Sequence, residues 1–320
     1  DPVVITVKLN QTQIEYDENG FQEKISFYSA EEDPVFSLSY GCYQYVMKPD
    51  SLGRIEEAWF CDSKGKPMTD EITGACGNRF VYDKKGYLNE VHYLDREENS
   101  IITTSGFASF VITRNDLGQV LKEETFDENN KLICSINNYA VAEYKYDSFG
   151  NITEVSFFDE NNNPCNHIDG YSTLKYKYEY GNLTETYCYD INGAPTLCNE
   201  NYHLVYYIYQ NGNLVHTSYY DTDIKLISNS FGYAIAETDY DESGNAVTDA
   251  YYNENSKPIA PPNYYLIKHK YDKLGNDIRT DYYTTESSKP HITVITNYDT
   301  YGNALYRVYY NSDGILFNVE

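Results

Sequence analysis

Ten glycines recur at nearly constant intervals along this chain, and they constrain its fold more than any other feature. The intervals are 33, 33, 32, 32, 31, 31, 32, 31 and 27 residues, so a module of about 32 residues repeats ten times from Tyr16 to the C-terminus. Such a period indicates a tandem-repeat architecture, in which each module contacts mainly its neighbours. The glycines are Gly20, Gly53, Gly86, Gly118, Gly150, Gly181, Gly212, Gly244, Gly275 and Gly302.

Each glycine ends a turn that begins with Tyr-Asp in six of the modules, as in the segments 146–150 and 240–244. An Asp side chain at the first turn position accepts hydrogen bonds from the backbone ahead of it. The glycine can take the positive φ that a hairpin with a G1 bulge requires. Each module is therefore predicted to contain one tight β-hairpin.

Two further marks divide the module. A mainly polar residue stands nine positions after every glycine, which indicates a strand of about eight residues because a one-residue slip would exchange its faces. A Gly or Asn then precedes the next strand, and we expect a sharp bend with positive φ there. These bend residues are Gly41, Gly74, Gly106, Asn138, Gly170, Asn201, Gly232 and Asn263.

No sustained 3.6-residue apolar period occurs, whereas partial alternation with β-branched and aromatic residues is typical of strands. We predict an all-β chain of about ten tandem β-hairpin modules in an elongated, coiled antiparallel array, like a solenoid. A β-propeller is the alternative, although its blades usually take four strands and more than about 40 residues. Residues 1–15 are expected to form an extra N-terminal strand, and residues 16–320 a single repeat domain.

The Tyr-Asp-x-x-Gly-Asn turn at positions 146–151, 240–245 and 298–303 resembles the YD repeats of Rhs and teneurin-like proteins. The resemblance covers most of the chain and implies a spiralling β-sheet, which in large family members forms a hollow shell around a toxin. This chain differs in having longer modules and no recognisable shell-closing or toxin domain. The resemblance therefore implies a coiled sheet on a bacterial surface or outside the cell.

The composition agrees with that location. With 24 basic and 49 acidic residues, the net charge of −25 argues against nucleic acid or anionic membrane as partners. No apolar segment reaches the length of a transmembrane helix, so direct membrane insertion is not expected. The chain begins at Asp1, as expected for a mature secreted or cell-surface form after signal-peptide removal, although a trimmed chain would look the same.

The cysteines admit two interpretations. Stacked modules would bring equivalent positions together, so disulfides between adjacent modules are candidates, and the alternative is that the cysteines are small buried apolar side chains. The candidates are Cys42, Cys76, Cys134, Cys165 and Cys198. No zinc spacing, nucleophile elbow or phosphate loop occurs. We therefore expect no catalytic, metal or cofactor site, and a protein that is not an enzyme.

Repeated aromatic pairs are the main candidate for binding. Stacked modules would align them into a ladder whose exposed rings could stack on sugars, whereas the alternative is that one ring of each pair is core and the other covers a sheet face. The ladder comprises Tyr219, Tyr220, Tyr251, Tyr252, Tyr282, Tyr283, Tyr309 and Tyr310. Sequons at Asn10, Asn151 and Asn182 are candidate glycosylation sites, although turn chemistry already accounts for the last two.

The two ends point to self-assembly. An open repeat array leaves strand edges that must be capped or used. The segment 3–9 has Val3, Ile5, Val7 and Leu9 on one face, and the chain ends in another apolar strand, 315–319. We therefore predict a non-enzymatic extracellular structural or adhesive protein that forms a filament head to tail by strand exchange, with itself or a surface glycan as partner. The alternatives are a cap formed by segment 3–9, a carbohydrate-binding module, or a fragment of an Rhs-like toxin shell.

Overall fold

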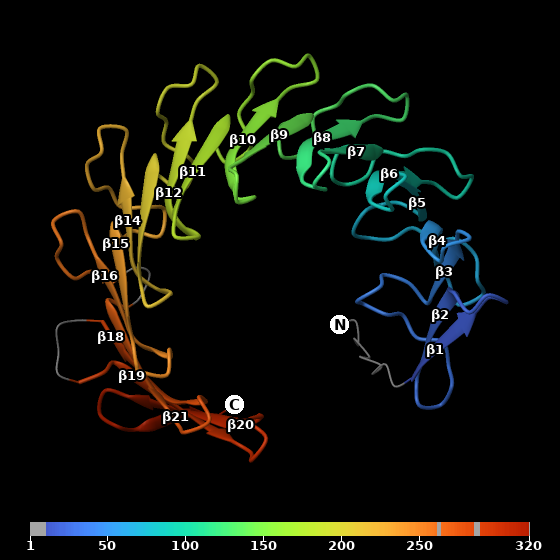
Figure 1. Cartoon of the computed structure of the whole chain (residues 1–320). Helices are drawn as coiled ribbons and strands as arrows, with labels where there is room; N and C mark the ends of the chain where they lie inside the picture. Colours follow the sequence, from blue (N-terminus) through green and yellow to red (C-terminus); the bar gives the residue numbers. More distant parts are fainter. Residues whose placement is uncertain (1–10, 261–263, 285–288, 320) are drawn as a thin grey trace, which may run out of the picture. The chain divides into compact units, whose positions relative to one another are not determined.

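The protein is all-β in this computed structural model, which describes residues 11–260, 264–284 and 289–319. The chain forms two compact units. Unit 1 contains the residues up to Lys145 together with Val155–Ile168, and unit 2 contains Tyr146–Glu154 together with the residues from Asp169 onward. The strands of each unit follow one another in chain order (Figure 1). The described residues contain no helix, so none of them forms a helix that could cross a membrane.

The strands are six to eight residues long except for the last, which has four. Unit 1 contains β1 (Gln11–Tyr16), β2 (Gln22–Tyr28), β3 (Gln44–Pro49), β4 (Ile55–Cys61), β5 (Gly77–Tyr82), β6 (Leu88–Leu94), β7 (Ser109–Arg114), β8 (Val120–Phe126) and most of β9 (Val141–Tyr146) and β10 (Ile152–Phe158). Unit 2 contains β11 (Thr173–Glu179), β12 (Asn182–Tyr189), β13 (Leu204–Gln210), β14 (Asn213–Tyr220), β15 (Ile235–Tyr240), β16 (Ala246–Tyr252), β17 (Leu266–Tyr271), β18 (Asp277–Tyr283), β19 (Ile292–Tyr298), β20 (Ala304–Asn311) and β21 (Leu316–Val319).

Strands β1 to β9 of unit 1 and β11 to β21 of unit 2 pair in succession, always antiparallel. The hairpin β13–β14 has a register shift beside its turn, between Ile208 and Tyr209. Between modules the ladder is shorter, as where Glu185–Tyr187 pairs with Leu204–Tyr206. The ladder thus continues from module to module within each unit. This confirms tandem hairpins in an open antiparallel array and contradicts the separate four-stranded blades of the propeller alternative.

The hairpin turn owes its shape to one carboxylate and one glycine. In the turn between β15 and β16, the Asp241 N–H donates to the Asn245 carbonyl and the Gly244 N–H to the Asp241 carbonyl, both at 3.0 Å. The Asp241 Oδ1 accepts the backbone N–H groups of Ser243 and Asn245, each at 2.9 Å. Gly244 has a φ of +84°, which side chains with a Cβ rarely adopt. This conformation is the physical reason for the repeated glycine.

A second turn of the same kind follows nine residues after the glycine. After β14, the Asp221 N–H donates to the Lys225 carbonyl at 2.9 Å and the Ile224 N–H to the Asp221 carbonyl at 3.1 Å. Ile224 here has a φ of +60°. The chain then runs back beside the strand it has just left, as the bridge between Tyr220 and Leu226 shows. We call the stretch from this second turn to the next module's first strand the return segment.

The tyrosine of the Tyr-Asp turn joins its module to the preceding one. The Tyr271 hydroxyl donates to the carbonyl of Ala246, at the start of β16, at 2.8 Å. The equivalent tyrosines make the same bond with lengths of 2.9 to 3.2 Å: Tyr82, Tyr240 and Tyr298. In the module of β7, where arginine replaces this tyrosine, the Arg114 Nη1 donates to the Leu88 carbonyl at 2.7 Å. A donor at this position therefore recurs because a strand carbonyl lies opposite it.

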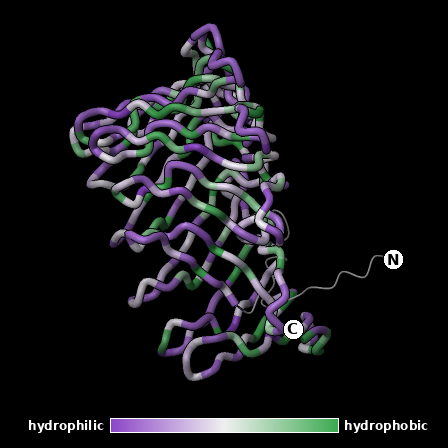
Figure 2. The backbone as a smooth tube through the Cα atoms, turned by 90° about the vertical axis from the view of Figure 1, so that its right-hand side faces the viewer, coloured by the Kyte–Doolittle hydropathy of each residue, from purple (hydrophilic) through white to green (hydrophobic). Residues whose placement is uncertain are grey.

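The core lies between one face of the sheet and the return segments that fold back over it. A buried cluster at the start of the chain consists of Ile25, Phe27, Cys42, Met47 and Ala58. Small residues follow the bends, where the return segment passes close to the sheet, and Ala108, Ala140 and Ala234 are completely buried. Hydrophobic and hydrophilic stretches alternate along the backbone (Figure 2). This alternation is expected of strands with one covered face.

The bends of successive return segments stack on one another. The Ile136 N–H donates to the Ser105 carbonyl at 3.0 Å, and the Ser230 N–H donates to the Glu200 carbonyl at 2.8 Å. At Gly106 a Cβ atom would lie only 3.2 Å from the Ile136 backbone nitrogen. Close backbone approach therefore accompanies the positive φ at these bends.

Candidate functional site

The ten turn glycines all lie at hairpin ends and have φ values between +82° and +91°. The bend residues likewise have positive φ, from +66° to +92°, except that Asn263 lies outside the described residues. The backbone conformation expected from the sequence is thus present at each of the described positions.

The first tyrosine of each aromatic pair packs toward the return segments. Tyr219 lies 5.5 Å from Tyr202 and 5.7 Å from Tyr233, measured between ring centroids. Tyr251 lies 5.0 Å from Tyr233 in the same way. Two more pairs continue the pattern: Tyr282 with Tyr264 at 4.7 Å and Tyr309 with Phe317 at 6.1 Å. Burial raises the pKa of Tyr219, Tyr251 and Tyr282, in keeping with rings that belong to the core layer.

The second tyrosine of each pair points to the opposite face, because neighbouring residues of a strand alternate. The Lys268 ammonium group lies 5.5 Å from the Tyr283 ring centroid. The Tyr220 hydroxyl lies 3.2 Å from the Ser218 hydroxyl. All eight tyrosines of the ladder are half-buried and none is exposed. The two rows therefore belong to two faces, and neither offers fully open rings.

The most exposed aromatic side chains lie at the hairpin tips, in the residue directly before the turn glycine. Tyr180, Phe149 and Tyr301 have exposed fractions of 103%, 90% and 89%. The sequence pattern does not single out these residues, because the turn's repeated Asp and Gly are its main features. The signal was nevertheless present, since a large apolar residue between two turn formers has no core to enter.

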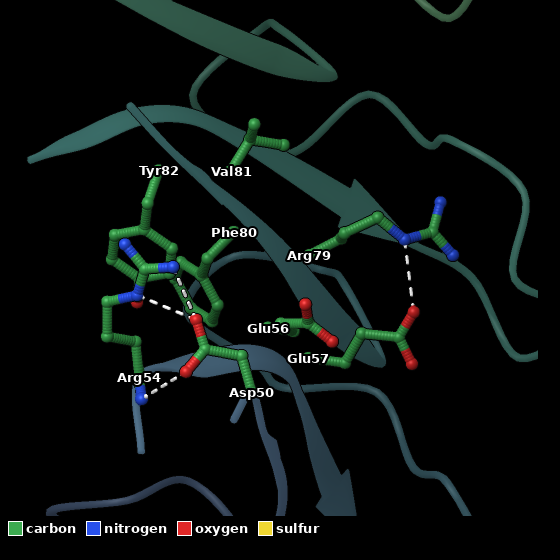
Figure 3. A pocket seen from close by; sticks show the side chains of 8 residues that line it. All are labelled: Asp50, Arg54, Glu56, Glu57, Arg79, Phe80, Val81 and Tyr82. Atoms are coloured by element: carbon green, nitrogen blue, oxygen red, sulfur yellow. Dashed lines mark hydrogen bonds and ion pairs between the residues drawn. The ribbon is translucent and has the colours of Figure 1, made fainter. Parts of the chain in front are cut away.

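A shallow hollow of ≈ 390 Å³ lies beside the hairpin end of β3 and β4 (Figure 3). The Arg54 guanidinium pairs with Asp50 at 2.5 Å and stands 4.7 Å over the Tyr82 ring. Burial raises the pKa of Asp50, but hydrogen bonds from the Arg54 side chain and backbone outweigh it and hold this pKa below its usual value. Arg79 pairs with Glu57 at 3.1 Å. Both cations of the hollow are therefore neutralised within it.

All seven cysteines carry free thiols. Of the five disulfide candidates, Cys42, Cys76 and Cys198 are buried, and Cys134 and Cys165 are half-buried. The Cys134 thiol lies 2.9 Å from a carboxylate oxygen of Glu160. The disulfides between modules stay a prediction.

The glycosylation candidates differ in their surroundings. The Asn151 side-chain nitrogen donates to Asp147 at 2.9 Å, so it serves the turn. Asn182 is half-buried and pairs with Glu179 in the hairpin ladder. Asn10 and the four residues of the assembly strand, Val3, Ile5, Val7 and Leu9, lie outside the described residues. Within the described ranges, no group of three or more His, Cys, Asp or Glu is arranged to hold a metal ion.

The fold defines a tandem β-hairpin repeat protein. No family model matches the chain, and no curated protein matches it. Among solved structures, it is similar to the Photorhabdus luminescens Tc holotoxin pore, with 12% identity and a TM-score of 0.47, over 94% of this chain and 15% of that one. It is also similar to a TcdB2–TccC3 crystal structure, with 13% identity and a TM-score of 0.36, over 96% of this chain and 18% of that one. The chain thus spans less than a fifth of the length of these structures.

Proposed function

We propose that this protein is a non-enzymatic extracellular repeat protein with a structural or adhesive role, whose copies join head to tail through their strand edges. The observation that carries the proposal is the C-terminal patch, which combines exposed apolar side chains with a partly unpaired strand edge. We use the name C-terminal patch for the exposed apolar residues on both faces of β20, β21 and the turn between them, which have exposed fractions between 46% and 62%: Leu305, Tyr306, Ile315, Leu316, Phe317 and Val319.

Strand β20 has fewer strand partners on its outer edge than the equivalent strand of the preceding module. In the preceding module, β18 uses Arg279–Tyr282 to pair with β19. The equivalent residues of β20 are Tyr306–Tyr309, counted from the turn glycine. Strand β21 covers Val308 and Tyr309, and among the described residues Tyr306 and Arg307 have a strand partner on the β19 side alone. Unpaired backbone groups beside exposed apolar side chains are a template for another strand.

The N-terminal end of the repeat array has a second strand edge, that of β1. Strand β1 pairs with β2 on one side, and its Gln11–Gln13 occupy the positions that other modules use to pair with a preceding strand. The apolar segment 3–9 precedes this edge in the chain. A junction of three or four residue pairs is all that interior modules use. We propose that the segment 3–9 of one copy, with β1, pairs with the C-terminal edge of the next.

Two variants test this proposal by light scattering. Phe317→Asp places a charge in the exposed C-terminal patch, so the chain should fold and no longer assemble. Leu274→Asp is the matched control, because Leu274 is also exposed but lies at a hairpin tip. Loss of assembly in both variants, or in neither, would show that the patch is not the contact.

Carbohydrate binding is a second candidate, supported by the aromatic hairpin tips more than by the half-buried ladder. Tyr180, Phe149 and Tyr301 expose almost the whole side chain, and such rings can stack on sugars. Binding on a glycan array that is lost in Tyr180→Ala and Tyr301→Ala would support it.

Membership of the YD-repeat group, and with it a place in an Rhs-like toxin shell, is a third candidate. It is supported by the Tyr-Asp-x-x-Gly-Asn turns. It is also supported by the hydrogen bond that the turn tyrosine, such as Tyr82, donates to a strand carbonyl of the preceding module. A toxin reading frame beside the gene would favour it. A secreted or cell-surface location belongs to all three candidates.

A further inference from the structure

Two cysteines of one module lie against each other in the core of unit 2. Cys188 is the penultimate residue of β12, and Cys198 lies in the return segment just before its bend. Cys188 is completely buried and Cys198 is 6% exposed. Both lie against the same short segment, since the Cys188 N–H donates to the His203 carbonyl at 2.8 Å and the Cys198 N–H to the Tyr202 carbonyl at 2.9 Å. This contact joins the sheet to the return segment that covers it.

The contact follows from the path of the module. Cys188 and Cys198 stand seven and seventeen residues after Gly181. In the preceding module the same two positions hold Phe157 and His167, whose ring centroids are 5.0 Å apart. In the following module they hold Tyr219 and Asn229, which both contact Tyr233: its ring lies 5.7 Å from that of Tyr219, and its carbonyl accepts the Asn229 N–H at 2.9 Å. The fold therefore brings these positions together, and this is the one module of the sequence with cysteine at both.

At the position equivalent to Cys198, two other modules have a side chain that accepts a hydrogen bond from a backbone N–H of the bend. The Ser135 Oγ accepts the Asn137 backbone N–H at 3.2 Å. The Asn229 Oδ1 accepts the Phe231 backbone N–H at 3.0 Å. A thiol is a weak acceptor, whereas a thiolate is a strong one. This bend therefore favours the ionised form of a cysteine placed there.

The surroundings of the two sulfurs differ accordingly. The neighbouring Cys188 side chain lowers the pKa of Cys198, burial opposes this, and the backbone N–H groups of Tyr202 and Glu200 lower it further. The pKa of Cys188 shifts upward, because its own hydrogen bond to Cys198 and its burial both favour the protonated form. The acceptor position at the bend and the greater exposure of Cys198 therefore make Cys198 the nucleophile of the pair, with Cys188 as the proton donor.

We propose that Cys188 and Cys198 form a disulfide within their module by exchange with a small-molecule disulfide. The Cys198 thiolate attacks one sulfur of that disulfide and releases its other half as a thiolate. The Cys188 sulfur then attacks the Cys198 sulfur of the mixed disulfide and releases the second half. The two thiol protons pass to the two leaving thiolates, so the small disulfide is reduced and the cysteine pair is oxidised.

The bond would hold the return segment on the sheet at a point that supports the bend stack. Directly after Cys198, the Asn199 N–H donates to the Asp169 carbonyl of the preceding bend at 2.7 Å. A disulfide also restricts the unfolded chain. Oxidation should therefore stabilise unit 2 against unfolding.

Disulfide mapping of the whole wild-type chain tests the pairing. The protein is incubated with glutathione disulfide, unfolded, alkylated without reductant, digested and analysed by mass spectrometry. We expect one crosslinked peptide pair, joining Cys188 to Cys198, with the other five cysteines alkylated. A crosslink from Cys198 to Cys165 or Cys134, or alkylation of all seven cysteines, would overturn the proposal.

Variants separate the roles of the two sulfurs. Cys188→Ala should accumulate a glutathione adduct on Cys198, whereas Cys198→Ala should leave Cys188 unmodified. Cys165→Ser is the matched control and should still form the bond. Oxidation should raise the urea midpoint of wild type and of this control, and should raise that of neither alanine variant. An adduct on Cys188 instead of Cys198 would contradict the assignment of the nucleophile.

Discussion

The Tyr271 hydroxyl lies 2.8 Å from the carbonyl oxygen of Ala246, one module earlier in the chain. This bond explains why the tyrosine is repeated. It links the hairpin turn to the first residues of a strand in the preceding module. Burial raises the pKa of Tyr271, so its hydroxyl stays protonated and donates.

Replacing Tyr271 by Phe removes this bond and keeps the ring. A neutral hydrogen bond contributes about 1 kcal/mol, so we expect the free energy of unfolding to fall by about that amount. Tyr16→Phe is the matched control, since Tyr16 is an exposed tyrosine of the first Tyr-Asp turn. Urea unfolding followed by circular dichroism measures both. Equal midpoints for the two variants would show that the bond does not contribute.

Two glycines separate the cost of positive φ from the cost of crowding. Gly170 and Gly181 have φ values of +90° and +84°. A Cβ at Gly170 would lie 2.9 Å from the Asn199 Oδ1, whereas at Gly181 it would meet nothing within 4 Å. Gly181→Ala should cost about 1 kcal/mol from backbone strain, and Gly170→Ala should cost more. Thermal unfolding of both variants checks the order, and the reverse order would count against the bend stack.

His269 predicts a dependence of stability on pH. Its ring nitrogens lie 2.7 Å from Asp277 on β18 and 3.4 Å from Asp249 on β16. The hydrogen bond with Asp249 raises the pKa of His269, burial opposes this, and the bond with Asp277 raises it further. A raised folded-state pKa gives stability that is complete below the unfolded value of about 6.5 and is lost as the pH rises through the folded value.

The urea midpoint should therefore fall between about pH 6 and pH 8 in wild type and change less in His269→Gln over that range. The variant should lose about 1–3 kcal/mol at the acidic end, where the charged hydrogen bonds are present. His291→Gln, at an exposed histidine, should keep the wild-type profile. A profile for His269→Gln that matches wild type would remove His269 as the cause.

The hairpins can be predicted from the sequence because their turn conformation requires particular residues. A φ of +84° at Gly244 excludes most other residues, so the period is visible as glycine. The second turn is less visible in the sequence, since its positive φ falls on residues such as Glu98 and Ile224. There the hydrogen bonds to the Asp side chain and between the backbone groups impose the turn on residues that do not favour positive φ.

The return segment explains what could not be predicted of the candidate sites. The contact between Cys188 and Cys198 exists because this segment folds back along its own strand, as the bridge between Tyr189 and Pro195 shows. Taken alone, a proline at this position predicts only that the strand ladder stops. For the same reason Tyr219 is half-buried against Tyr202 and Tyr233, and the expected open ladder is two rows on two faces.

Sedimentation velocity of the wild-type protein over a wide concentration range tests head-to-tail assembly most directly. A contact between unlike edges does not close, so the weight-average sedimentation coefficient should keep rising with concentration past the value of a dimer. Strand pairing depends little on salt, so the rise should persist at high ionic strength. A single monomeric species at every concentration would contradict the account, and deletion of residues 1–9 should produce that monomer with its β-sheet circular dichroism intact.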